Sequence, residues 1–279
     1  MIGHDLLRLD RIEIEDCGPD AQKLAEAIHA QLPMQPGRVP VARIARALDI
    51  EDIRVERLQS FDGCLITDSQ HNYGAILVNA DVSPERQQFT IAHELLHFLD
   101  PSHQPTDDPQ MFQCTRQDLG QSWRQPPAAV TRHILQERQA NRFAIELLAP
   151  RHWIKAWLRG IPDLAQVVAM AQTFGISREA SARRYNDLLE RPTAIVFTHD
   201  NRVRYTQRDN GFPVLAVRHG DAAPVTPPAA DGSGLSAHEE GDPLDWFAPG
   251  HRQPLVVQTL HQQKGYAMTL LALDEDNEC

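Results

Sequence analysis

The feature that most constrains this chain is the motif HELLH within the apolar stretch FTIAHELLHF, residues 89–98. The preceding residues SPE, at 83–85, provide a helix N-cap, a first-turn proline and a first-turn acid. Asp100-Pro101 provides a stop, because a residue before proline is pushed towards extended conformations. We therefore predict a helix from Pro84 up to Asp100. Apolar residues lie on most of its sides, so the helix should be buried, and polar side chains in such surroundings need partners.

The motif has the spacing of a metal-binding helix. His93 and His97 are four residues apart on one helical face, so both imidazoles can reach one metal ion. A catalytic zinc ion takes three protein ligands and a water molecule, whose pKa it lowers to about 7. Glu94 points beside the metal, where it can accept a proton from that water and deliver it to a leaving amine. The alternative is a chance arrangement among the 13 histidines of the chain, but the helix signals on both sides favour a metal site.

The third metal ligand has two candidates. His103 follows His97 at the HExxHxxGxxH spacing of the metzincins, but Asp100-Pro101 stands where their glycine allows the chain to turn. Glu137 lies in the stretch QERQANRFA, on a second helix predicted over residues 129–148. It shares a helical face with Asn141, which could orient a ligating imidazole through the free N–H of that ring. On local pattern alone, a solvated Glu/Arg face explains this stretch equally well.

The patterning along the chain predicts three parts, at 1–150, 151–191 and 192–279. The first part has two helices within residues 20–48, strands at 53–58, 63–67 and 75–79, and a loop or insertion at 101–127. The second part is helical, with a helix-turn-helix pattern over 163–190. The third part is β-rich, with strands at 195–197, 203–205, 214–217, 255–260 and 266–273 and a mobile linker or loop at 220–242.

Composition narrows the class of protein. The net charge of −11 argues against a surface built mainly to hold phosphate backbones. No apolar run is long enough to span a membrane, and the N-terminal residues lack the apolar core of a secretion signal. The four cysteines are scattered without a CxxC pair, which is typical of free thiols in a reducing compartment. We therefore expect a cytoplasmic protein without a membrane partner.

The segments PERQQFTIAHELLHFL and ERQANRFAIELLAP together resemble the ImmA/IrrE family of intracellular zinc metallopeptidases, and the hairpin DGCLITDSQHNYGAILVNA fits that family too. The resemblance covers about residues 20–190. It implies an α+β fold with a zincin-like peptidase domain over 1–150, in which an HExxH helix packs on a small β-sheet. It also implies zinc bound by His93, His97 and Glu137, with Glu94 as the catalytic acid/base. Family members cleave helix-turn-helix repressors of the Xre type, which releases genes for stress responses or mobile elements.

The chain departs from the family pattern in three places. Leu96 stands where many relatives have Gly, Ala149 stands where many have Met, and the interval between the two motifs is long, in keeping with an insertion at 101–127. In radiation-response members, a helical linker and a GAF-like domain follow the peptidase domain. Residues 192–279 are short for a GAF domain, so we expect only a small β-rich domain there, GAF-like or a sensor.

Two other classes of function compete with the peptidase interpretation. The helix-turn-helix pattern suggests a DNA-binding regulator, but acidic residues offset its basic ones, so a packing role is favoured and direct DNA binding is not expected. A metal-sensing or binding module without proteolysis is disfavoured by the intact Glu94. Tyr73 and His133 are polar residues near the motifs, with no stronger argument for a role in stabilising an oxyanion. In the helix-turn-helix pattern, the basic residues are Arg178, Arg183, Arg184 and Arg191, and the acidic residues that offset them are Glu179, Asp187 and Glu190.

Overall fold

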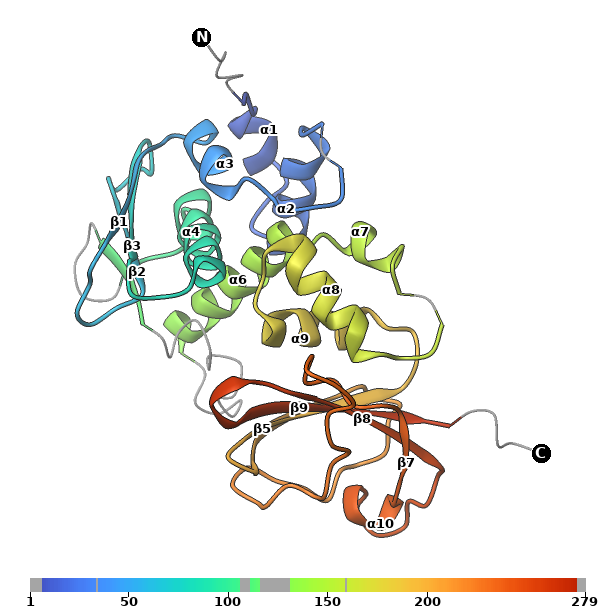
Figure 1. The fold of residues 1–279 in the computed structure, drawn as a ribbon. Helices are drawn as coiled ribbons and strands as arrows, with labels where there is room; N and C mark the ends of the chain where they lie inside the picture. Colours follow the sequence, from blue (N-terminus) through green and yellow to red (C-terminus); the bar gives the residue numbers. More distant parts are fainter. Residues whose placement is uncertain (1–6, 34, 106–110, 116–130, 159, 275–279) are drawn as a thin grey trace. The chain divides into compact units, whose positions relative to one another are not determined.

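The structure is a computed structural model that describes residues 7–33, 35–105, 111–115, 131–158 and 160–274. The chain divides into two compact units. Unit 1 comprises Met1–Pro150 and Thr173–Ser177, and unit 2 comprises Arg151–Gln172 and Arg178–Cys279. Each unit combines helices with one β-sheet (Figure 1), which confirms the predicted α+β class. Within the described residues, no helix is both long enough and apolar enough to cross a membrane.

Unit 1 begins with three short helices. In the first two, an aspartate caps the helix by accepting hydrogen bonds from backbone N–H groups of the first turn: Asp10 from Glu13, and Asp20 from Gln22 and Lys23. Two of these helices lie in the predicted region 20–48, whereas the first was not predicted, because five residues are too few for a periodic pattern. The helices are α1 (Arg11–Glu15), α2 (Ala21–Ala30) and α3 (Val41–Ala47).

The sheet of unit 1 has the strand order β1-β3-β2-β4. The predicted hairpin is present as the antiparallel pair β2–β3, and β1 pairs in parallel with β3. Strand β1 begins at Ile50, earlier than predicted. In the predicted loop or insertion at 101–127, residues 106–110 and 116–127 lie outside the described residues. Strand β4 corrects the prediction where the chain is described, since it pairs antiparallel with β2 at the sheet edge. The strands are β1 (Ile50–Glu56), β2 (Gly63–Thr67), β3 (Gly74–Asn79) and β4 (Met111–Cys114).

Helix α4 (Pro84–Leu99) packs on this sheet, and a second long helix, α6 (Arg132–Leu148), packs on α4. Helix α4 starts at Ser83, whose hydroxyl accepts from the N–H of Arg86, and ends at the extended residue Asp100, close to the predicted bounds. Helix α6 lies within the helix predicted over 129–148. Helix α4 contacts strands β2 and β3 as well as helix α6 (Figure 1). The motif therefore sits in the core of unit 1, between a sheet and a second helix.

Unit 2 contains helices and a five-stranded antiparallel sheet of order β6-β5-β9-β8-β7. The helix-turn-helix pattern is present as two helices joined at Gly175, whose φ of +64° suits glycine. The final hairpin was also predicted. The helices are α7 (Arg151–Lys155), α8 (Leu164–Phe174), α9 (Arg178–Leu188) and α10 (Pro243–Trp246), and the strands are β5 (Thr193–His199), β6 (Arg202–Arg208), β7 (Glu239–Gly241), β8 (Leu255–His261) and β9 (Tyr266–Leu273).

One prediction for unit 2 was wrong, and another was right only in part. Residues 214–217 form no strand, and Leu215 makes only a single bridge to Phe247. Leu215 and Val217 instead pack against an apolar cluster that includes Trp246, so their hydrophobic character reflects packing rather than a ladder. The segment 220–242 was predicted to be a linker or loop, and most of it is a loop. It is not a free linker, because its last residues form strand β7 beside β8 and its backbone bonds to neighbouring segments.

Candidate metal centre

The structure brings together His93, His97 and Glu137, although they come from two helices. His93 and His97 project from α4, and their Nε2 atoms lie 3.2 Å apart. The carboxylate of Glu137, on α6, reaches both rings, with Oε2 3.1 Å from Nε2 of His93 and Oε1 3.3 Å from Nε2 of His97. All three side chains are buried, and their ligand atoms form a compact group that could hold a metal ion.

The separations of these atoms fit one small cation. Zinc bonds to nitrogen and oxygen at about 2.0–2.1 Å in tetrahedral sites, which places neighbouring ligand atoms about 3.3 Å apart. The three measured separations, 3.1, 3.2 and 3.3 Å, lie close to that value. Two histidines and one carboxylate are also a donor set that catalytic zinc sites use. The residues present therefore fit a metal ion.

The second nitrogen of each ring is held by a partner that fixes its proton. Nδ1 of His93 lies 3.2 Å from Oδ1 of Asn141, which can only accept, so Nδ1 donates. Nε2 of His103 lies 3.1 Å from Oε1 of Gln139 and must donate in the same way. In a neutral His103, Nδ1 then accepts from Nδ1 of His97 across 2.9 Å. Both Nε2 atoms that face Glu137 therefore carry lone pairs, as metal ligands require.

Such an arrangement needs a positive charge at its centre. Two imidazole lone pairs and a carboxylate converge within hydrogen-bonding distance in a buried place, where their mutual repulsion is not screened by water. Burial raises the pKa of the Glu137 carboxyl, but when no ion is present, N–H groups of the His93 and His97 rings that point at the carboxylate take the place of that charge, outweigh burial and hold the pKa well below its usual range. Glu137 is therefore an anion, the form that binds a cation.

His103 lies on the opposite side of His97 from Glu137. Helix α4 ends at Asp100, and the N–H of His103 bonds back to the carbonyl of Asp100 at 3.0 Å, so the chain turns beneath the helix end. The imidazole of His103 contacts Nδ1 of His97, whereas the atom of His97 that could bind the metal ion is Nε2. Burial lowers the pKa of His103, which keeps this ring neutral. In this geometry His103 contacts Nδ1 of His97, and it is not a member of the group formed by His93, His97 and Glu137.

Glu94 lies under strand β2, where the sheet leaves room for it. A Cβ atom on Gly63 would come 2.2 Å from Cγ2 of Thr90 and 3.6 Å from Oε1 of Glu94, so only glycine allows this strand to pass so close to α4. The thiol of Cys114, which pairs with Gly63 across β4 and β2, contacts the Glu94 carboxylate. Sequence reasoning missed Gly63 and Cys114, because their relevance depends on strand register.

The two candidates for oxyanion stabilisation occupy different places. His133 lies at the start of α6, 3.7 Å from Oε1 of Glu137, and its side chain is 36% exposed. It is therefore a half-exposed imidazole beside the buried cluster. Tyr73 lies on the turn between β2 and β3 and is 53% exposed, and no described contact joins its side chain to the cluster. The structure places only His133 near the ligands.

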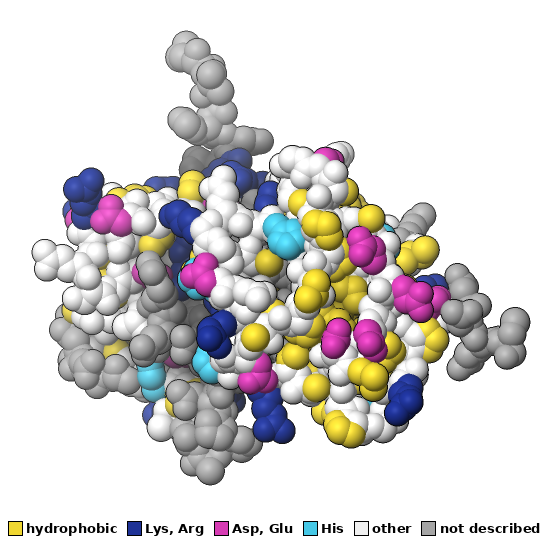
Figure 2. Space-filling view, turned by 60° about the horizontal axis from the view of Figure 1, so that its bottom comes forward, with side chains coloured by type: hydrophobic (Ala, Val, Ile, Leu, Met, Phe, Trp, Pro, Cys, Tyr) yellow, Lys and Arg dark blue, Asp and Glu magenta, His cyan; other side chains and the backbone are white. Residues whose placement is uncertain are grey.

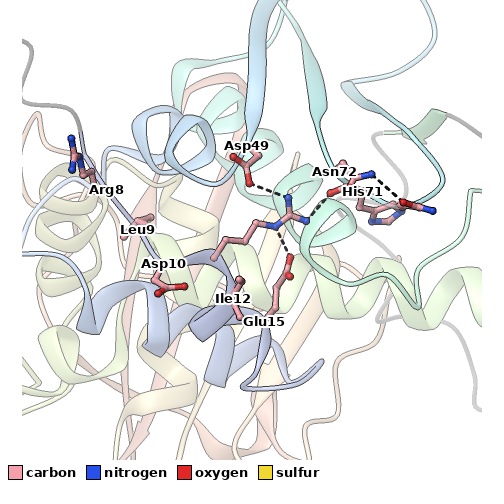
Figure 3. Close-up of a pocket in the computed structure, with 10 residues that line it drawn as sticks. Arg8, Leu9, Asp10, Ile12, Glu15, Asp49, His71 and Asn72 are labelled. Carbon is pink, nitrogen blue, oxygen red and sulfur yellow. Dashed lines mark hydrogen bonds and ion pairs between the residues drawn. The ribbon is translucent and has the colours of Figure 1, made fainter.

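A pocket of about 770 Å³ lies elsewhere in unit 1, between α1 and the turn that joins β2 to β3. Arg11 is one of the residues that line it, and its guanidinium donates to Glu15, to Asp49 and to the carbonyl of His71. Figure 3 shows the lining, with Glu15, Asp49 and His71 labelled. These contacts satisfy the cation and fix α1 to the body of the unit. None of the candidate metal ligands lines this pocket.

Two histidines on an HExxH helix, with a glutamate from a second helix, are a donor set that metallopeptidase sites use. Residues 48–119 match the model of the peptidase family M78, described as the IrrE N-terminal-like domain. This match confirms, over that region, the resemblance to the ImmA/IrrE family. The matched region contains His93, Glu94 and His97 and ends before Glu137, whose role therefore depends on the geometry.

The fold of the chain is also similar to that of a solved structure. A Mycobacterium tuberculosis transcriptional regulator matches with a TM-score of 0.56 and 14% sequence identity, over 94% of this chain and 80% of that one. At this identity the similarity concerns the fold alone. A comparison with curated proteins finds no match.

Proposed function

We propose that this chain is a zinc-dependent endopeptidase of the cytoplasm, with zinc held by His93, His97 and Glu137. The observation that carries this proposal is the convergence of the two Nε2 atoms and the Glu137 carboxylate at separations of 3.1–3.3 Å. Zinc suits this set because imidazole and carboxylate ligands in a compact, four-coordinate arrangement favour it. The peptidase family match supports a hydrolytic role for the ion.

When bound, zinc supplies a Lewis acid that polarises a carbonyl and lowers the pKa of a water molecule. Glu94 lies on the same helix as both imidazoles and directly follows His93, so its carboxylate is placed to take the proton from that water. The same carboxylate then delivers a proton to the nitrogen of the leaving amine. His133, half-exposed beside Glu137, is the nearest described imidazole that can donate to the developing oxyanion.

Strand β4 offers a place for an extended peptide. It lies at the edge of the sheet and, among the described strands, pairs only with β2. Its Phe112 ring stacks on the imidazole of His97 with centroids 4.9 Å apart, and Cys114 contacts Glu94. A peptide that pairs with an exposed strand gains backbone hydrogen bonds, so β4 would hold a substrate alongside the catalytic groups.

The proposed substrate is a small helix-turn-helix repressor of the Xre type, whose cleavage would release stress-response or mobile-element genes. The family resemblance supports this substrate class, and a buried centre supports selectivity over general digestion. We assign residues 1–150 to the peptidase domain, 151–191 to a helix-turn-helix-like segment, and 192–279 to a β-rich domain that selects substrate or senses a signal.

A second candidate is a regulator that binds DNA or a metal without proteolysis. The α8–α9 pair and the fold similarity to a transcriptional regulator favour it. Against DNA binding, Arg183 and Arg204 both pair with Glu179, which leaves less positive charge for phosphates. Figure 2 shows basic side chains scattered among acidic ones, and the described part of that face carries no continuous basic patch.

The test is incubation of the zinc-loaded chain with an Xre-type repressor encoded beside its gene, followed by intact-mass analysis. We expect two repressor fragments from the wild-type chain and none after zinc removal by a chelator. Glu94→Gln keeps the imidazoles and removes the proton acceptor, so it should retain zinc and lose about 10²–10⁴ in rate. Cleavage by Glu94→Gln at the wild-type rate would overturn the mechanism. Tight binding of the repressor without cleavage by the wild-type chain would favour the regulator.

A further inference from the structure

A second set of metal ligands overlaps the first. His93, Glu94 and Cys114 each offer a ligand atom, and these atoms all lie within 4.8 Å of one another. The three residues are 0%, 0% and 1% exposed. Among the described residues, this set and the set of His93, His97 and Glu137 are the groups of this kind, and they share His93. The proposed peptidase mechanism makes no use of Cys114.

The fold places the Cys114 thiol in the site through strand pairing. Cys114 is the last residue of β4 and lies opposite Gly63 of β2. Gly63 has no side chain to separate the sheet from α4, so the thiol reaches the Glu94 carboxylate. An ordinary cysteine thiol has a pKa of about 8.5, so at pH 7 without a metal ion the sulfur carries a proton.

A buried thiol beside a carboxylate and an imidazole discriminates between metal ions. Thiolate is a soft ligand that binds Zn²⁺ and Cd²⁺ well, whereas Mg²⁺ and Ca²⁺ prefer oxygen. A metal ion must displace the thiol proton before it can bind, and only a strong metal–sulfur bond offsets that cost. The second set is therefore selective for soft ions.

We propose that His93, Glu94 and Cys114 form an alternative, catalytically silent site for a soft divalent cation, which rests on the proposed metal centre. The ion exchanges the S–H bond of Cys114 for a metal–sulfur bond and releases one proton to solvent. Because both sets need His93, one ion occupies one set or the other. In the alternative site Glu94 is a ligand, so it no longer serves as a proton acceptor. The balance between the two sets decides whether a metal-loaded chain is active.

The test uses Cd²⁺ as the probe and thiolate-to-metal charge-transfer absorbance as the readout. All variants are full chains in which Cys17 and Cys279 are replaced by serine, so that these thiols do not contribute. In Glu137→Gln, which weakens the first set, one equivalent of Cd²⁺ should give a thiolate band. The band should disappear in Glu137→Gln/Cys114→Ser and persist in the matched control Glu137→Gln/Cys64→Ser, which removes another buried thiol of the same sheet.

His97→Ala allows the same Cd²⁺ test in a second background, because it weakens the first set and leaves all three residues of the second set in place. The same band, and the same loss with Cys114→Ser, are expected there. Absence of a thiolate band in both Glu137→Gln and His97→Ala, or a band that survives Cys114→Ser, would overturn the proposal. The readout is absorbance, so failure to cleave any repressor leaves this test unaffected.

Discussion

Nδ1 of His103 lies 2.9 Å from Nδ1 of His97, while Nε2 of His97 faces Glu137 at 3.3 Å. One ring nitrogen is thus directed to the candidate metal position and the other to a neutral histidine that is itself anchored to Gln139. His103, although it has the spacing of a metzincin ligand, therefore holds the ring of the candidate ligand His97 through the nitrogen that faces away from Glu137. Partners of this kind fix the tautomer and direction of a ligating imidazole and typically contribute about 10- to 100-fold in metal affinity.

This relationship predicts that Glu137→Gln lowers zinc affinity more than His103→Ala does. A site made of three histidines would give the opposite order. Glu137→Gln removes the charged ligand and should abolish stoichiometric zinc retention in the catalytic set. His103→Ala should keep one zinc per chain at saturating metal but weaken its affinity about 10- to 100-fold. Competition with a chromophoric chelator measures both. Near wild-type affinity in Glu137→Gln, with loss of zinc in His103→Ala, would identify His103 as the ligand.

The shared ligand predicts an asymmetry between the two motif histidines. His93→Ala removes a member of both ligand sets and should leave no bound zinc after dialysis. His97→Ala removes a member of only one set, that of His93, His97 and Glu137, so weak zinc binding that depends on Cys114 should remain. Elemental analysis of the two variants, with and without Cys114→Ser, measures the difference. Wild-type zinc content in His93→Ala would exclude the site.

Gly63 sets the distance between the sheet and α4. Gly63→Ala places a Cβ atom 2.2 Å from Thr90 and 3.0 Å from the carbonyl of Leu77, so strand and helix must separate. We expect a loss of about 1–3 kcal/mol in the free energy of unfolding, the usual cost of overpacking. Gly37→Ala is the control, since the nearest atom to its added Cβ is 3.9 Å away. Urea unfolding of both variants decides the matter, and equal midpoints would contradict the close approach.

Glu179 predicts a pH-dependent contribution to the stability of unit 2. Burial raises its pKa, but the hydroxyl of Tyr205 and the guanidinium groups of Arg183 and Arg204 outweigh burial and leave the pKa below its usual value. The folded state therefore favours the carboxylate, and this stabilisation is present above the unfolded pKa of about 4.3 and lost as pH falls through the folded value.

At pH 7, Glu179→Gln should lower the free energy of unfolding by about 1–2 kcal/mol, a value reduced for solvent screening because the side chain is about one-third exposed. In strong acid the wild-type carboxyl is protonated and the difference should vanish. Thermal unfolding across pH checks this, with the exposed Glu240→Gln as control. A difference that grows as the pH falls would contradict the assigned network.

The parts of the fold that could be predicted carry their signals locally. Ser83 and Pro84 start α4 and Pro101 ends it, so the bounds of this helix follow from neighbouring residues. Strand β4 could not be predicted, because four residues carry no periodic signal and the strand forms only by pairing with β2. The apolar residues at 214–217 resemble a strand, but Leu215 and Val217 pack on the Trp246 cluster without a ladder.

In the candidate site, too, some features have local sequence signals and others depend on contacts between distant segments. The spacing of His93 and His97 on one helix was sufficient to predict that their rings converge. Glu137 lies on another helix, so local pattern left it undecided and the family resemblance favoured it over His103. The roles of Gly63 and Cys114 depend on which residue of β4 faces which residue of β2, a relationship that the sequence alone does not contain.

The distribution of the candidate ligands over α4 and α6 has a consequence for the lifetime of the protein. An ion shared by His97 and Glu137 closes the long chain segment between them, which an unfolded chain could close only at a large cost in entropy. An ion present at about 100 times its dissociation constant adds about 2.7 kcal/mol to the stability of the folded state. If zinc is the ion that this site holds, zinc starvation would expose unit 1 to proteolysis, and zinc supply would then affect the abundance of the protein as well as the proposed activity.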